Sequence, residues 1–86
     1  MKLVIVSVKD MAADAYARPF YVQSIGMALR SFMDEVNRED ANNTMFHHPE
    51  DFALYHLGEF DDNTGKFDLL EIPKLLSSAK QAKISE

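Results

Sequence analysis

Residues 48–67, HPEDFALYHLGEFDDNTGKF, contain the pattern that decides the predicted fold. Apolar side chains alternate between the two sides of an expected strand, with Phe52, Leu54 and Phe60 on one side and Ala53, Tyr55 and Leu57 on the other. Residues 61–65, Asp-Asp-Asn-Thr-Gly, are turn formers that end in a glycine suited to a left-handed backbone. We therefore expect a β-hairpin whose second strand runs through residues 67–72.

Three other segments complete the expected elements. Residues 3–8 are an apolar run, interrupted only by Ser7 and rich in β-branched side chains, which is typical of a buried strand. Residues 25–36 carry apolar side chains at helical spacing after Ser24, a good N-cap residue, so they predict an amphipathic helix. Pro73 suits the first turn of a second helix, expected over residues 74–83.

Residues 9–23 give a weaker pattern, because Pro19 pushes the residue before it toward extended geometry. A short helix or turn followed by an extended segment is expected there. The predicted fold class is α+β, with a small antiparallel sheet of three or more strands in β-α-β-β-α order. One long amphipathic helix is expected to pack on a face of this sheet.

The chain has 86 residues, which corresponds to a single domain, and it contains no cysteine. A domain of this size buries only about 60–65% of its unfolded surface, so its core is small. Neither a disulfide nor a thiolate metal site can reinforce that core. The open edge of a small sheet adds a second reason for self-association, and we expect a homodimer.

Charge and hydropathy exclude several classes of function. The net charge is −5, from 14 acidic and 9 basic residues, which argues against a uniformly cationic coat for nucleic acid. The apolar run near the start is six residues long and is broken by Ser7, so we expect no secretory signal. No apolar run approaches the roughly 18–20 residues of a membrane span, and no membrane partner is expected.

The residues do not match a catalytic or metal motif. The sequence has no GxSxG, no phosphate-binding glycine loop and no cysteine nucleophile, so an enzyme is not expected. The turn at 61–65 resembles the start of a calcium loop, but Lys66 and Ile72 occupy the positions that require Gly and Glu. The three histidines and their acidic neighbours lack the spacing of a zinc site, so neither a metal nor another cofactor is expected.

One segment of the sequence is a candidate for nucleic-acid binding. Residues 9–21 mix cations with aromatic side chains, a combination that holds single strands through base stacking and phosphate contacts. Composition alone favours a structural reading, in which Phe20 and Tyr21 pack under the helix and Arg18 is a surface charge. The candidate DNA-binding residues are Lys2, Lys9, Tyr16, Arg18, Tyr21 and Arg30, followed in a second tier by Lys66, Lys74, Lys80 and Lys83.

An ordered set of segments resembles a known viral family. The set comprises MKLVIVSVKD at 1–10, Arg-Pro-Phe at 18–20, Ala-Leu-Arg-Ser-Phe at 28–32, the stretch 48–65 and a C-terminal segment that begins with Pro73. The sequence resembles the small nonstructural DNA-binding protein of gokushoviruses, a branch of the Microviridae with circular single-stranded DNA genomes. The resemblance covers nearly the whole chain, although no single motif in it is specific to a mechanism.

The resemblance implies a bacteriophage protein in the host cytoplasm that binds viral single-stranded DNA. It also implies a role in the switch from genome replication to packaging into procapsids, and it carries no catalytic residues. The alternative is a protein–protein adaptor between viral replication and capsid proteins that does not touch DNA. Its motivation is the acidic surface expected around residues 34–40 and 61–62, which could steer a basic partner.

Overall fold

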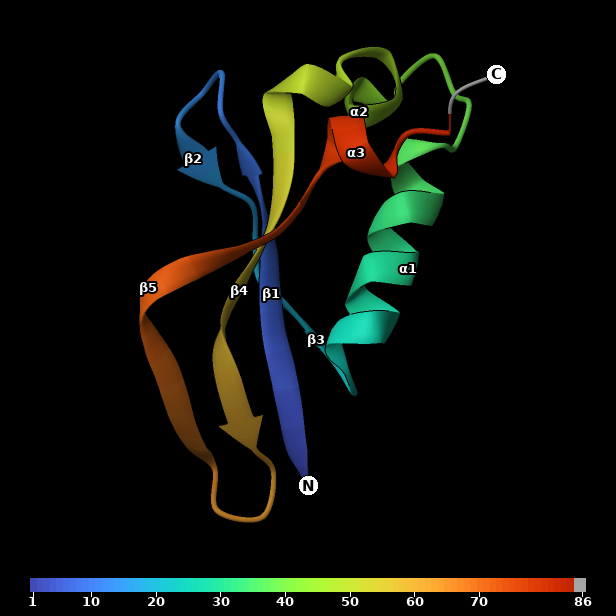
Figure 1. The fold of residues 1–86 in the computed structure, drawn as a ribbon. Helices are drawn as coiled ribbons and strands as arrows, with labels where there is room; N and C mark the ends of the chain where they lie inside the picture. Colours follow the sequence, from blue (N-terminus) through green and yellow to red (C-terminus); the bar gives the residue numbers. More distant parts are fainter. Residues whose placement is uncertain (85–86) are drawn as a thin grey trace.

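The computed structural model describes residues 1–84 and shows one curled, antiparallel sheet with helices on one side (Figure 1). The strands are β1 (Lys2–Asp10), β2 (Ala15–Tyr16), β3 (Phe20–Val22), β4 (Phe52–Asp61) and β5 (Lys66–Ser78). The helices are α1 (Ile25–Val36), α2 (Thr44–His47), a 3-10 turn (Pro49–Asp51) and α3 (Ala79–Ala82).

The two long strands β1 and β4 form the centre of the sheet. β1 pairs with β4 on one side, and the short strands β2 and β3 both pair with its other side, at opposite ends. β5 pairs with the outer side of β4 and forms the opposite edge of the sheet. The register shifts near Leu57 and again along β5, and such irregularities bend and twist a sheet, in keeping with its curl into a half-barrel.

The core lies between the sheet and the helices α1 and α3. Its buried residues are Val4, Val6, Leu54, Ala28, Phe32, Val36 and Ala79. The helical spacing of residues 25–36 predicted α1 correctly, and the Ser24 hydroxyl accepts a hydrogen bond from the Met27 amide as the N-cap. The hairpin is also confirmed, and Gly65 in its turn has a φ of 74°.

The predicted fold class is wrong. Strands account for 44% of the residues, and α1, the helix that was expected to be long, has only 12 residues. The protein is therefore mostly a curled sheet with short helices. The helix expected over residues 74–83 is largely absent, because β5 continues to Ser78 and leaves only Ala79–Ala82 helical. Pairing of Leu75 with Tyr55 across the sheet outweighs the local helix propensity of this segment. Strands β2 and β3 are too short for a periodic pattern to reveal.

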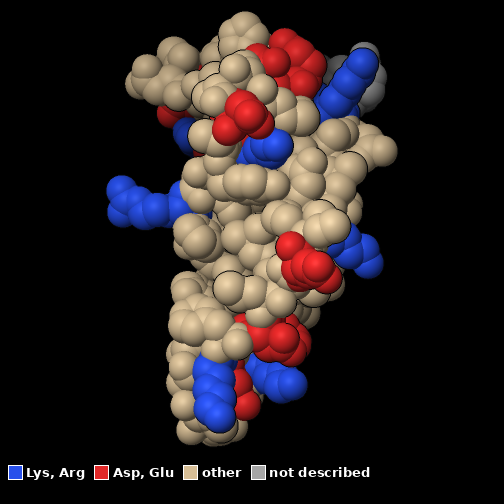
Figure 2. Space-filling view, turned by 90° about the vertical axis from the view of Figure 1, so that its left-hand side faces the viewer, with Lys and Arg blue, Asp and Glu red and all other residues tan. Residues whose placement is uncertain are grey.

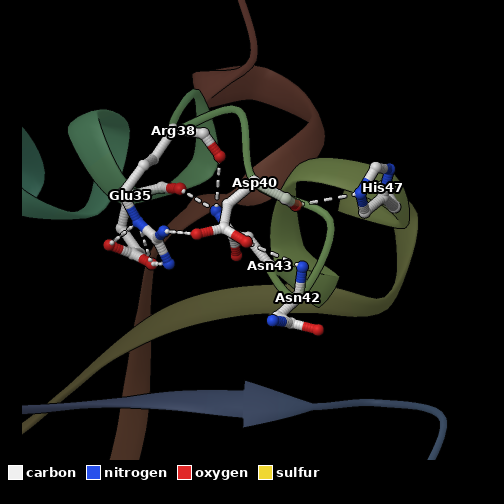
Figure 3. A network of polar contacts seen from close by, with 6 residues as sticks. All are labelled: Glu35, Arg38, Asp40, Asn42, Asn43 and His47. Atoms are coloured by element: carbon white, nitrogen blue, oxygen red, sulfur yellow. Dashed lines mark hydrogen bonds and ion pairs between the residues drawn. The ribbon is translucent and has the colours of Figure 1, made fainter.

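A polar network closes the C-terminal end of α1 (Figure 3). The buried Asn43 side chain donates two hydrogen bonds, to the carbonyl oxygens of Glu35 at 2.7 Å and Arg38 at 2.8 Å. The backbone amide of Asn42 and the guanidinium group of Arg38 donate hydrogen bonds to the Asp40 carboxylate, and these bonds lower the pKa of the Asp40 carboxyl below its usual value. This network ties the loop that follows α1 to the helix.

Candidate nucleic-acid interface

The face of the sheet away from the helices carries most of the aromatic side chains of the strands. Residues that pair across neighbouring strands project to the same face of the sheet. Ile5, which pairs with Tyr21 and Gly58, therefore projects to the face opposite that of the buried Val4 and Val6. We call this surface the aromatic face. Its aromatic residues are Tyr16 from β2, Tyr21 from β3, Tyr55 and Phe60 from β4, and Phe67 from β5.

One end of the aromatic face holds a tyrosine pair beside a cation. The rings of Tyr16 and Tyr55 meet edge to face, with their centroids 5.6 Å apart. The Lys9 ammonium lies 5.4 Å from the centroid of the Tyr16 ring and 3.4 Å from a carboxylate oxygen of Asp14. Tyr16 is 42% exposed, so a flat ligand can reach its ring from solvent.

The other end of the aromatic face is a row of three rings bordering an apolar groove. Phe60 lies between Tyr21, at a centroid distance of 5.9 Å, and Phe67, at 4.8 Å. The groove has a volume of about 400 Å³ and extends from Pro19 to Pro73 across Ile5 and Leu57. The residues that line this groove are apolar or aromatic, and none of them is a cation.

Arg18 is positioned by the connection between β2 and β3. The hydroxyl of Ser7, which is fully buried, donates a hydrogen bond of 2.6 Å to the carbonyl oxygen of Ala17, and the Ala17 amide donates to Val8 at 2.8 Å. These bonds hold the segment against β1. The exposed Arg18 therefore lies between Tyr16 and Tyr21 along the same edge of the sheet.

The structure brings together four of the ten predicted DNA-binding residues, all near the β2–β3 edge: Lys9, Tyr16, Arg18 and Tyr21. The other six are scattered. Lys2 of β1 and Lys66 of β5 lie on either side of Asp61 of β4, and all three project to the helix-bearing face. Lys74 pairs with His56 and projects to the same face. Arg30 lies on α1 and Lys80 on α3, while Lys83 donates to the Phe46 carbonyl oxygen and covers the Phe46 ring.

The carboxylates of the paired strand residues avoid the aromatic face. Asp10, Glu59, Asp61 and Asp68 each occupy the alternate positions that project to the helix-bearing side. Figure 2 looks onto the side away from α1, and the middle of this view is mostly uncharged, with basic side chains projecting at its left and lower left. The acidic residues of the paired strands that contribute to the net charge of −5 therefore lie mainly on the helix-bearing side.

Sequence reasoning missed three members of the aromatic face: Tyr55, Phe60 and Phe67. The alternation in residues 52–60 correctly put Tyr55 on the side opposite Leu54, which was a usable signal. The same alternation put Phe60 with Leu54, and this was wrong because the irregularity at Leu57 reverses the side on which later residues project.

A cluster of His48, Glu50 and Asp51 lies outside this face. The ligand atoms of the three residues are within 4.8 Å of one another, and His48 Nδ1 is 3.5 Å from a Glu50 carboxylate oxygen. All three are solvent-accessible, which is the ordinary setting of a weak surface ion pair. Within the described chain, no helix is long and apolar enough to cross a membrane.

These features define a small, β-rich protein with helices on one face of its sheet and exposed aromatic rings on the other. The model of the Phage ORF5 protein family matches residues 3–82, so the chain belongs to this bacteriophage family. No curated protein and no solved structure shows a significant match to the chain.

Proposed function

We propose that this protein is a non-enzymatic DNA-binding protein that holds single-stranded DNA along the β2–β3 edge of its aromatic face. Bases stack on Tyr16 and Tyr21, while Lys9 and Arg18 contact phosphates. A single strand fits this surface because it offers unpaired bases to rings, and stacking on rings needs no particular base. Strong sequence preference is therefore not expected.

The observation that carries the proposal is the shared location of exposed tyrosines and cations on a face with few carboxylates. Tyr16 and Tyr21 are 42% and 48% exposed, although aromatic rings in a small protein are usually needed for its core. The carboxylates of the paired strand residues project to the other face, which reduces repulsion of phosphates despite the net charge. The site has two cations per protomer, and one of them, Lys9, lies 3.4 Å from an Asp14 carboxylate oxygen, so binding should be modest and salt-sensitive.

The biological role follows from the resemblance to the gokushovirus protein. In that role the protein associates with replicating viral DNA in the host cytoplasm and directs new single strands into procapsids. Membership of a bacteriophage family supports the viral setting. The Microviridae assignment and the role at the switch from replication to packaging rest on the resemblance alone.

Fluorescence anisotropy tests the binding proposal directly. A labelled oligo-dT of about 30 nucleotides is long enough for a site of this kind, and a matched duplex serves as the comparison. The expected result is salt-sensitive binding that favours the single strand. Absence of binding to either DNA at low salt would reject the proposal and leave the protein–protein adaptor.

Two variants locate the site. Replacing Tyr16 by Ala removes a stacking surface worth about 1–3 kcal/mol per base, which corresponds to a loss of affinity of about 5- to 150-fold. The double substitution of Arg18 and Tyr21 by Ala should lose more than about tenfold for the same reason. Arg30→Ala on α1 is the matched control that removes an exposed cation from the other side, and it should leave affinity nearly unchanged.

A further inference from the structure

The strand β5 is exposed to an extent that is unusual for a strand of the main sheet. Every residue from Lys66 to Leu75 is exposed, although this stretch is rich in large apolar side chains. Five of them form what we call the β5 patch: Phe67 at 56% exposure, Leu69 at 62%, Leu70 at 39%, Ile72 at 76% and Leu75 at 53%. A concentrated apolar surface of this kind marks an interaction site.

The total surface is larger than that of a compact monomer of this mass. The accessible surface is 5878 Å², whereas a compact monomer of 9.8 kDa exposes about 5,200 Å². The radius of gyration is 13.4 Å, compared with about 12 Å for a compact domain of this length. The excess of roughly 700 Å² is close to the roughly 800 Å² that each partner buries in a standard interface.

The charges along β5 favour a partner with the same surface. Lys66 and Lys74 balance Asp68 and Glu71, so the strand has no net charge. A strongly basic or acidic partner, nucleic acid included, would gain no net electrostatic attraction from this strand. A second copy in a two-fold arrangement about Ile72 can instead place Lys74 of one β5 close to Glu71 of the other, on both sides of the axis.

The geometry of β5 favours a closed dimer over a growing sheet. Residues 70–73 have no direct partners on β4, because the pairing jumps from Leu69 with Gly58 to Lys74 with His56. Pro73 removes a backbone donor in this irregular segment, and an irregular edge with proline resists continuous strand addition. Contact between two copies would therefore be made by apolar side chains around Ile72.

We infer that the β5 patch is a homodimer interface, in which the β5 strands of two copies pack against each other across a two-fold axis near Ile72. The patch lies at the β5 edge of the sheet, and Lys9, Tyr16 and Arg18 lie near the opposite, β2–β3 edge. Tyr21 lies closer to the patch, because it lines the groove that also contains Phe67, Leu69 and Leu70. Each dimer thus leaves Lys9, Tyr16 and Arg18 of both copies away from the interface. The dimer does not depend on DNA binding, so either proposal can fail alone.

Light scattering on the full chain without DNA tests the dimer. The expected mass is twice 9.8 kDa for the wild type, falling to 9.8 kDa for Ile72→Lys. Met27→Lys on α1 is the matched control, since Met27 is also an exposed apolar residue at 51% and the substitution adds the same charge. This control should remain dimeric.

A second test uses the absence of cysteine in the chain. Ile72→Cys should form an intermolecular disulfide under mild oxidation, because residues near a two-fold axis face their own counterparts. Met27→Cys should not do so at the same concentration. A monomeric wild type, or a dimer that Ile72→Lys leaves intact, would overturn the assignment, and so would equal cross-linking of the two cysteine variants.

Discussion

Gly58 is the position at which the curl of the sheet leaves no room for a side chain. It lies in β4 between Ile5 of β1 and Leu69 of β5, and its φ is 155°. A Cβ atom added there would lie 2.5 Å from the Asp68 carbonyl oxygen and 2.7 Å from the Leu69 Cα atom. Both contacts are to backbone, so the substitution Gly58→Ala must move β5 away from β4.

The expected loss of stability combines two effects. Overfilling a packed site costs about 1–3 kcal/mol, and a strained backbone conformation costs about 1–3 kcal/mol, so Gly58→Ala should lose about 2–6 kcal/mol. A chain of this length has only roughly 4–13 kcal/mol in total. The melting temperature should therefore fall by at least about 8 °C.

The other two glycines provide matched controls. Gly65 has a φ of 74° but open space around it, so Gly65→Ala should cost only the left-handed backbone term, about 1–2 kcal/mol. Gly26 lies in α1 with its nearest neighbour, Ser24 Oγ, at an ordinary 3.8 Å, so Gly26→Ala should gain about 0.5–1 kcal/mol.

Urea unfolding followed by far-UV circular dichroism measures all three variants, at one fixed protein concentration because association would shift the midpoint. The expected order of stability is Gly26→Ala, wild type, Gly65→Ala and then Gly58→Ala. A Gly58→Ala protein as stable as Gly65→Ala would refute the reasoning, because it would mean that the strands do not approach so closely at this position.

Four further predictions test the local arguments. Asn43→Ala removes a donor from the carbonyl oxygens of Glu35 and Arg38 in a buried site, although the Glu35 oxygen still accepts from the Arg38 amide, and urea unfolding should show a loss of about 1–3 kcal/mol; no loss would contradict the role of Asn43 in closing the end of α1. Ser7→Ala removes the hydroxyl that holds the β2–β3 connection, and should cost about 1 kcal/mol while increasing hydrogen exchange at the Ala17 amide. Folding lowers the pKa of the Asp40 carboxyl below 3.8, so the ionised carboxylate stabilises the folded state. This contribution is fully present above pH 3.8 and is lost as the pH falls through the pKa of Asp40 in the folded state. Asp40→Asn should therefore flatten the dependence of the unfolding free energy on pH below about 4, and an unchanged slope would exclude the effect. Lys9→Ala should reduce the slope of log affinity for oligo-dT against log salt by about 0.7, the value for one phosphate contact on a single strand.

The locally encoded elements were predictable from the sequence, and the candidate site was predictable only in part. Residues 25–36 formed a helix as their spacing indicated, and the 61–65 turn placed Gly65 in a left-handed conformation. The segment 9–21 contained the cations and tyrosines that now lie along one edge. Phe60 was assigned to the wrong side, because a single irregularity at Leu57 reverses the alternation and leaves no clear sign in the sequence.

The sequence by itself determined the helix α1, the hairpin turn and the strand β1, because helical period, turn chemistry and β-branched runs act over a few neighbouring residues. Only the tertiary structure decided that residues 74–78 are a strand, that β2 and β3 share one edge of β1, and that Lys9, Tyr16, Arg18 and Tyr21 lie together. These outcomes depend on hydrogen bonds and side-chain contacts between strands far apart along the chain. Such pairings follow from the whole sheet, and local propensity does not encode them.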